Sequence, residues 1–382
     1  MLSPRVAIRF SRHELWLRGR YRGNRTPAVV GYAESNACRD RAWRFGLGTK
    51  SPPHGHNRRV SSGHPYTALT PDVVVAAVEA LGHVCDGRIL ALNSYENRVY
   101  QVGREEGGPV VAKFYRPGRW TTPAILEEHE FALELARAEI PVIAPEVHDG
   151  RTLYEHVGFR YAVYPRAGGR WPELGSKEDR QWMGRFIARI HAVGRSRTFR
   201  HRARLDLATM GYDTVDYVLE AGWIPAHIEA AYESVAADAL DLVAQRFDEA
   251  RPLGELRLHG DCHPGNVLWT DAGPHFVDLD DCLTGPAIQD LWMLLSGRPQ
   301  EMRAQLDDIL DGYAEFADFD AHETTLIEPL RTLRIVHYAG WLARRWDDPA
   351  FPRAFPWFEE PKYWEQHVLD LREQIAAMEE EF

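Results

Sequence analysis

The sequence contains few cysteines and no long apolar run. Its four cysteines, Cys38, Cys85, Cys262 and Cys282, form no Cys-x-x-Cys pair, which argues against a zinc ribbon and against a disulfide framework. No stretch reaches the roughly 20 apolar residues that a transmembrane helix needs. The N-terminus also lacks the apolar core of a secretory signal. We therefore expect a cytoplasmic protein without a membrane partner.

Acidic residues are scarce at the start of the chain. Residues 1–63 contain thirteen lysines and arginines against three acidic residues, a net charge of +10, whereas residues 64–382 carry 32 against 53, a net charge of −21. Such asymmetry can indicate a nucleic-acid-binding arm, but the segment has no helical period and no interleaved aromatic and basic residues. We expect a disordered extension, or a segment translated from upstream of a true start at Val60, and no nucleic-acid partner.

The rest of the chain changes from strand-like to helical patterns. Alternating, strand-like runs surround two predicted helices, one over residues 71–81 and one over residues 124–139. Further along, long amphipathic segments predict helices, and strands are expected only around the segment described next. The pattern predicts an α+β fold with a β-rich N-terminal lobe, residues 64–165, and a helical C-terminal lobe, residues 166–382.

The segment LRLHGDCHPGNVLW, residues 256–269, places polar residues between apolar flanks, where an ordinary turn is the simplest explanation. However, Asp261 and Asn266 have the spacing of the base and the metal-binding asparagine in the kinase pattern H-R-D-L-x-x-x-N, and Asp278 follows at the position of the DFG aspartate. Phosphoryl transfer needs a carboxylate beside the attacking hydroxyl and hard oxygen ligands for Mg²⁺. The pattern therefore assigns Asp261 and Asp278 to catalysis, with Asn266 and Asp278 as metal ligands.

Two earlier residues complete the set. Lys113 interrupts an apolar strand and can place a charge at the α- and β-phosphates of ATP, and Glu128 on the following helix can fix Lys113 by an ion pair. Each element alone is weak, since a turn, a surface lysine and a solvated strand edge explain them equally well. Their shared order along the chain favours a kinase site. A zinc site from His259, Cys262 and His263 is disfavoured because no second cluster completes the coordination.

HGDCHPGNVLW and FVDLDD resemble the aminoglycoside phosphotransferase-like family of the protein-kinase fold, in which glycine replaces the arginine of HRD. VAKFYRP, ILEEHEFAL and DPAFPRAFPW are similar to segments of its bacterial serine/threonine protein kinases, so the resemblance runs from about residue 66 to about 365. It implies a two-lobed, kinase-like fold and an ATP- and Mg²⁺-dependent enzyme of stress responses, and we separately expect a monomer. Its acceptors would be serine or threonine hydroxyls of proteins, including its own.

The same resemblance implies roles for single residues. Asp261 would accept the proton, Ser94 would lie in the loop over the phosphates, and Asp290 would brace the catalytic loop. Lys113 with Glu128 would clamp the nucleotide. Two departures from eukaryotic-type kinases stand out: LNSYENRVY lacks the Gly-x-Gly-x-x-Gly pattern, and the metal-binding aspartate is followed by Leu-Asp rather than Phe-Gly, which removes the usual DFG switch.

Alternatives to a protein kinase stay open. A kinase of small hydroxyl compounds, of the aminoglycoside, choline or homoserine type, would use the same residues, because one fold serves several acceptors. A pseudokinase scaffold would bind nucleotide without transfer, but the intact polar set argues against it. The aromatic segment from Trp341 to Phe358 is either core packing or a wall of the acceptor site.

Overall fold

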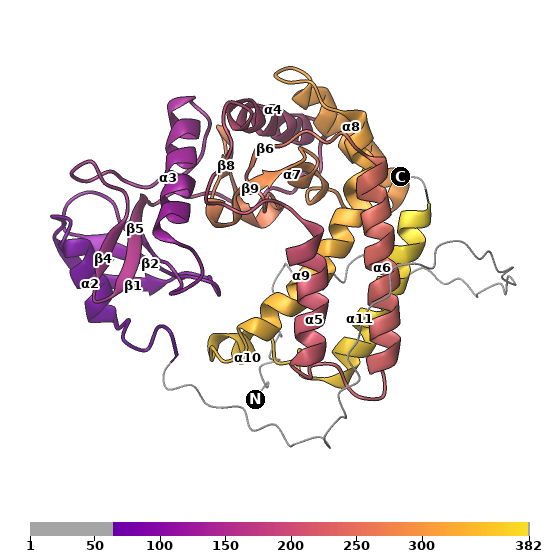
Figure 1. Cartoon of the computed structure of the whole chain (residues 1–382). Helices are drawn as coiled ribbons and strands as arrows, with labels where there is room; N and C mark the ends of the chain where they lie inside the picture. Colours follow the sequence, from indigo (N-terminus) through magenta and orange to yellow (C-terminus); the bar gives the residue numbers. More distant parts are fainter. Residues whose placement is uncertain (1–63, 381–382) are drawn as a thin grey trace, which may run out of the picture. The chain divides into compact units, whose positions relative to one another are not determined.

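The computed structural model describes residues 64–380 (Figure 1). The fold described below belongs to one compact unit, Gly63–Phe382. The predictions made for residues 1–63 lie outside the described residues. None of the helices between residues 64 and 380 combines the length and the apolar character that crossing a membrane requires.

An antiparallel sheet of five strands forms the N-terminal lobe. The strands are β1 (Cys85–Ala91), β2 (Arg98–Arg104), β3 (Val110–Phe114), β4 (Tyr154–His156) and β5 (Phe159–Pro165). They lie in the order β1-β2-β3-β5-β4, so Lys113 on β3 pairs with Val99 on β2 and with Ala162 on β5. The central strand of the sheet thus carries the predicted lysine. The predicted lobe boundary follows β5 directly and stays a prediction.

Two helices accompany this sheet, α2 (Pro71–Glu79) and α3 (Thr122–Arg137). Each begins where the sequence favours it, because the hydroxyls of Thr70 and Thr121 accept a backbone N–H from the first turn, which also contains a proline. The apolar face of α2 packs in the same core cluster as Phe114 and Tyr161 of the sheet. Glu128, a polar residue of α3, is buried and belongs to the candidate site described below.

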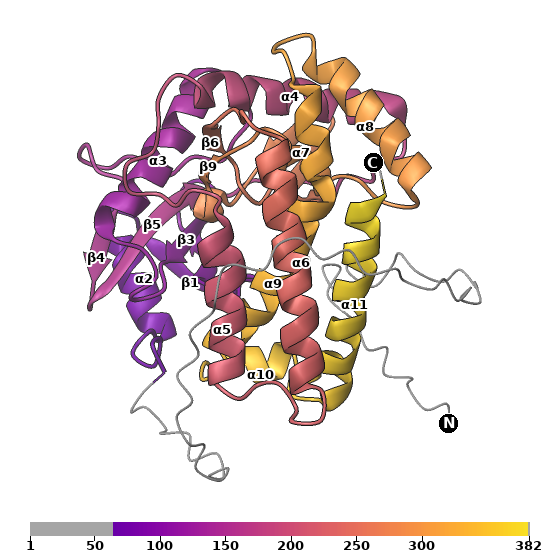
Figure 2. The same ribbon diagram turned by 45° about the vertical axis from the view of Figure 1, so that its right-hand side comes forward.

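The C-terminal lobe is helical. Its helices are α4 (Lys177–Gly194), α5 (Asp213–Glu220), α6 (Glu229–Glu249), α7 (Gln289–Trp292), α8 (Pro299–Tyr313), α9 (Ile327–Arg344), α10 (Ala350–Ala354) and α11 (Pro361–Glu379), with a π-helical turn η1 (Ala208–Tyr212) before α5 and a 3₁₀ segment η4 (Ala321–Leu326) before α9. Figure 2 shows α5, α6, α9 and α11 side by side, and they share one core cluster that includes Tyr232, Leu333 and Trp364. Trp346, Phe351 and Phe355 are buried in the same cluster, which supports core packing for these members of the aromatic segment.

Two small antiparallel pairs of strands flank the polar motifs. Strand β6 (Leu256–Leu258) pairs with β9 (Leu283–Gly285), and β7 (Val267–Thr270) pairs with β8 (Gly273–Phe276). The 3₁₀ turn η2 (Pro264–Asn266) lies between β6 and β7, and η3 (Leu279–Asp281) lies between β8 and β9. The two motif loops are therefore held at neighbouring strand ends.

Candidate active site

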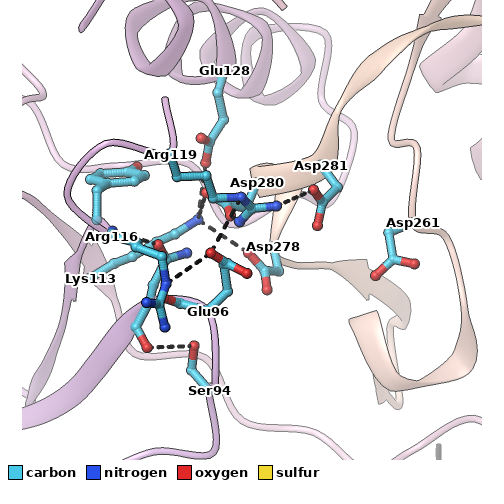
Figure 3. A network of polar contacts seen from close by, with 12 residues as sticks. Ser94, Glu96, Lys113, Arg116, Arg119, Glu128, Asp261, Asp278, Asp280 and Asp281 are labelled. Atoms are coloured by element: carbon cyan, nitrogen blue, oxygen red, sulfur yellow. Dashed lines mark hydrogen bonds and ion pairs between the residues drawn. The ribbon is translucent and has the colours of Figure 1, made fainter. Parts of the chain in front are cut away.

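Lys113 is the centre of the candidate site (Figure 3). Its side chain is 8% exposed, and its Nζ lies 3.2 Å from Glu128 Oε1, 3.2 Å from Asp278 Oδ1 and 3.1 Å from Asp280 Oδ1. Burial works to lower the pKa of Lys113, but the three carboxylates outweigh it and hold that pKa well above its usual value. Lys113 is therefore a cation at physiological pH. The structure brings together Lys113, Glu128 and Asp278, which the sequence analysis selected from distant segments.

Asp280 is a partner that the sequence analysis missed. It is buried, it contacts Arg119 from the loop after β3 as well as Lys113, and Arg202 donates to its backbone oxygen. Burial works to raise the pKa of Asp280, yet Arg119, Lys113 and Arg202 together hold it far below its usual range. The signal in the sequence was the second acidic residue of VDLDD, which is equally compatible with a solvated strand edge.

The two motif loops place Asp261, Asn266 and Asp278. Asn266 Nδ2 donates to the backbone oxygen of Asp261 at 3.0 Å and to its Oδ2 at 3.2 Å, so Asn266 Oδ1 is the atom that remains to bind a metal ion. Asp278 has left-handed backbone, with φ 61°, and its side chain is 53% exposed. A carboxylate and an amide oxygen are ligands that Mg²⁺ prefers. Asn266 and Asp278 therefore fit the metal that the sequence predicts.

Asp290 on α7 fixes the backbone immediately before Asp261. Its Oδ2 accepts the N–H of His259 at 2.8 Å, and its Oδ1 accepts the N–H of Gly260 at 2.8 Å. His191 Nε2 lies 3.1 Å from the same Oδ2, so a buried side chain from α4 supports Asp290 in turn. These hydrogen bonds agree with the bracing role expected of Asp290, which stays a prediction.

Gly260 explains why the motif contains HGD rather than HRD. Its φ is +84°, and a Cβ atom at this position would lie 2.2 Å from the backbone oxygen of Asp281. Left-handed backbone costs glycine little, and a carbonyl oxygen that close leaves no room for any side chain. The arginine of HRD has no place here because the loop that carries Asp281 packs directly on the catalytic loop.

Arg334 on α9 is a second residue that the sequence analysis missed. Its Nη1 donates to Asp261 Oδ1 at 2.7 Å. Together with the bond from Asn266, this charge-assisted bond holds both carboxylate oxygens of Asp261. Arg334 is 73 residues beyond Asp261 and belongs to no motif, so no spacing along the chain marks it.

The loop between β1 and β2 contains Ser94 and Glu96. The Ser94 hydroxyl donates to the backbone oxygen of Asn97 at 3.1 Å, which places it inside this loop (Figure 3). Within its own lobe, Glu96 pairs with Arg116. Glu96 also contacts two residues at the end of α9: Trp341 Nε1 donates to its Oε2 at 2.6 Å, and Arg345 pairs with the same carboxylate. The loop is therefore attached to the C-terminal helices.

Asp348, in the turn between α9 and α10, makes a second connection of this kind. It is 2% exposed and accepts from Arg98 Nη2 at 2.9 Å and from Arg116 Nη2 at 2.6 Å. We call Glu96, Asp348, Arg98, Arg116 and Arg345 the clasp. The aromatic segment thus serves core packing at its buried positions and contacts the loop between β1 and β2 through Trp341.

The model described as the phosphotransferase enzyme family matches residues 88–324. Stress response kinase A of Escherichia coli is 44% identical over 320 residues, which cover 84% of this chain and 97% of that relative. A Salmonella typhimurium protein named serine/threonine protein kinase RdoA is 44% identical over 317 residues, 82% of this chain and 95% of that relative. The family predicted from the sequence is confirmed.

Solved structures share the fold at low sequence identity. Amicoumacin kinase in complex with AMP-PNP and Ca²⁺ superposes with a TM-score of 0.59 at 19% identity, over 75% of this chain and 92% of that one. Spectinomycin phosphotransferase in complex with ADP gives a TM-score of 0.54 at 14% identity, over 76% and 92% of the two chains. The predicted α+β, two-lobed, kinase-like fold is confirmed.

Proposed function

The chain belongs to the phosphotransferase enzyme family, and we propose that it is a protein kinase that transfers the γ-phosphoryl group of ATP to serine and threonine hydroxyls. The observation that carries the proposal is the contact of Lys113 with Asp278, 165 residues later in the chain. In the loop before Asp278, Asp261 is held by Asn266 of the same loop and by Arg334 of α9. An isolated turn or surface lysine has no reason to form such a group.

The proposed reaction is an in-line displacement at phosphorus. The acceptor oxygen forms a bond to the γ-phosphorus, the bond from that phosphorus to the β,γ-bridging oxygen breaks, and ADP leaves with the electron pair. Asp261 receives the proton of the acceptor hydroxyl. Lys113, held by Glu128 and Asp280, binds the α- and β-phosphates, and Ser94 with nearby backbone N–H groups covers them. Asn266 and Asp278 hold Mg²⁺, which neutralises phosphate charge when bound.

Protein hydroxyls are the acceptors that the relatives support. One relative is named a serine/threonine protein kinase, and others are named stress response kinase A, so we place this enzyme in a cytoplasmic stress response. Amicoumacin kinase and spectinomycin phosphotransferase share the fold, and their names indicate small-molecule acceptors. The fold is therefore compatible with both acceptor classes, and the acceptor must be tested directly.

The test is transfer from ATP labelled at the γ-phosphate, with purified protein, Mg²⁺, a generic protein acceptor and, separately, a panel of amino sugars and amino alcohols. We expect label on serine and threonine of the protein acceptor and background transfer to the small alcohols. Asp261→Asn should reduce turnover by about 10³-fold while ATP still binds, because the proton acceptor is lost. Efficient phosphorylation of a small alcohol with an unlabelled protein acceptor would assign the enzyme to the small-molecule kinases.

Self-phosphorylation belongs to the same proposal. Mass spectrometry of the protein after incubation with ATP and Mg²⁺ should find phosphate on its own serine or threonine residues, and the Asp261→Asn protein should remain unmodified under the same conditions. Equal phosphorylation of the two proteins would show that the phosphate came from another enzyme during expression.

A further inference from the structure

His83, Glu146 and His148 form a cluster away from the candidate active site. His83 lies between α2 and β1, and the other two precede β4. None of them contacts Lys113, Asp261 or Asp278 in the interactions described above. Within residues 64–380, this is the group of three such side chains whose ligand atoms all lie within 4.8 Å of one another.

The distances fit a metal ion. Glu146 Oε2 lies 3.1 Å from His148 Nε2 and 3.7 Å from His83 Nε2. Tetrahedral zinc with bonds of about 2.1 Å places its ligand atoms roughly 3.4 Å apart, so small rotations of the two imidazoles would complete the arrangement. The centroids of the two imidazole rings lie 5.1 Å apart, and the rings meet edge to face at 90°.

The groups are held in place before any ion binds. The backbone N–H of Glu146 donates to Val163 of β5 at 2.7 Å, and that of His148 donates to the Tyr154 hydroxyl at 3.0 Å. His83 Nε2 is buried and has no hydrogen-bond partner within the described residues. A buried polar nitrogen without a partner is costly, and an ion between these three side chains would satisfy it.

We propose that His83, Glu146 and His148 form a zinc site that links the turn after α2 to the segment before β4. Two imidazole nitrogens and one carboxylate match the donors of zinc, whereas Mg²⁺ prefers oxygen alone. The side chains are 14%, 25% and 24% exposed, so water can reach the fourth coordination position. The site is separate from the magnesium site of the proposed function.

Arg104 sets the strength of this site. Its Nη1 lies 3.3 Å from His83 Nδ1, the atom that carries the proton when Nε2 binds a metal. Zinc binding therefore requires the guanidinium to leave Nδ1, although Arg104 can keep its bond to the backbone oxygen of Gly108. The native site is consequently weakened by a neighbouring cation. Arg104→Gln supplies an amide oxygen for Nδ1–H and should tighten zinc binding about 10-fold.

The experiment uses the full chain, stripped with a chelator and then titrated with zinc in excess Mg²⁺ against a chromophoric competitor. The wild type should bind one more equivalent than His83→Gln, Glu146→Gln or His148→Gln. His156→Gln, on neighbouring β4, is the matched control and should bind as the wild type does. The comparison also removes any contribution from His54 and His56, which lie outside the described residues.

Cobalt provides a second measurement, because tetrahedral Co²⁺ has intense visible absorption that reports the ligand set directly. The wild type should show this absorption and the three ligand variants should lose it. If a histidine variant does not fold, the conservative Glu146→Gln variant decides. Equal zinc stoichiometry and equal cobalt spectra in the wild type and the ligand variants would overturn the site, as would unchanged or weaker zinc affinity in Arg104→Gln.

Discussion

Arg334 approaches the carboxylate that we propose as proton acceptor more closely than any motif residue does. It donates to Asp261 Oδ1 at 2.7 Å from a helix that the motif does not include. A guanidinium in this position restricts the orientation of the carboxylate. We regard Arg334 as a positioning residue, since it acts through Asp261.

Arg334→Gln should lower kcat about 100-fold, the cost of a small misplacement of a catalytic group, while KM for ATP changes little. Steady-state kinetics separates the two constants. Arg334→Lys should recover part of the loss because it restores the charge, and Arg353→Gln, an exposed arginine on α10, should behave as the wild type does. A kcat unchanged in Arg334→Gln would remove Arg334 from the mechanism.

At the scale of residues, the order and spacing of the motifs along the chain predicted four members of the candidate site: Lys113, Asp261, Asn266 and Asp278. Their proximity in space is expected from the kinase-like fold, which the same motifs identify. Arg119 and Arg334 were not predictable, because arginines are common on surfaces and their partners are set by tertiary contacts alone. Asp280 was visible in VDLDD but could not be distinguished from a solvated residue.

At the scale of elements, the clasp attaches the loop between β1 and β2 to the end of α9. Burial works to raise the pKa of Asp348, but the N–H of Ala350 and the guanidinium groups of Arg116 and Arg98 hold it below its usual value. The carboxylate therefore stays charged and paired at neutral pH. One helix, α9, thus contacts both Asp261 through Arg334 and the loop through Trp341.

Asp348→Ala should lower the free energy of unfolding by about 3 kcal/mol, because it leaves the buried Arg116 and the largely covered Arg98 without their shared carboxylate. Urea denaturation measures the loss. Asp347→Ala is the matched control, since Asp347 is exposed, and should stay within about 0.5 kcal/mol of the wild type. Equal losses in both variants would mean that the clasp contributes no stability.

The elements themselves were predicted unevenly. Helices α2 and α3 were predicted from their apolar periods, and their observed bounds differ from the predicted ones by two residues at three of the four ends. Strands β6 to β9 have three or four residues each, too few for a period of two to stand out. The sequence showed only that strands lie around the motif loops, and not how they pair.

At the scale of the whole molecule, a buried histidine links stability to pH. His367 on α11 is 2% exposed and stacks on Tyr232 of α6, and burial lowers its pKa to about 4. The unfolded chain has an ordinary histidine pKa of about 6.5. Because the folded state binds the proton less readily, stability is complete above that value and is lost as the pH falls toward 4.

This difference corresponds to a loss of about 3 kcal/mol between pH ~6.5 and pH ~4. His367→Gln has no imidazole to protonate, so its free energy of unfolding should fall less over the same range. Denaturant titrations at several pH values measure both slopes. His322→Gln, which changes an exposed histidine, should keep the wild-type slope, and a wild-type slope in His367→Gln would contradict the assignment.

Removal of residues 1–62 should leave the melting temperature and the kinase activity unchanged, because the basic charge and linker-like composition of this segment indicate no part in the fold. A longer deletion, through residue 69, supplies the contrast. It removes Tyr66, whose ring stacks on Phe159 and lies under the guanidinium of Arg98. The longer deletion should lower the melting temperature, and an equal loss in the shorter one would show that residues 1–62 support the fold.

The buried position of Asp280 has a consequence for inhibitor discovery. Many compounds that block eukaryotic kinases occupy the space that opens when the phenylalanine of DFG swings outward. In this chain Leu279 occupies the position of that phenylalanine. The neighbouring Asp280 forms ion pairs with Lys113 and Arg119, so an outward swing of this segment would separate the two cations from their shared carboxylate. Libraries built around that displaced phenylalanine should yield few hits against this enzyme, and screening is better directed at compounds that compete with the nucleotide.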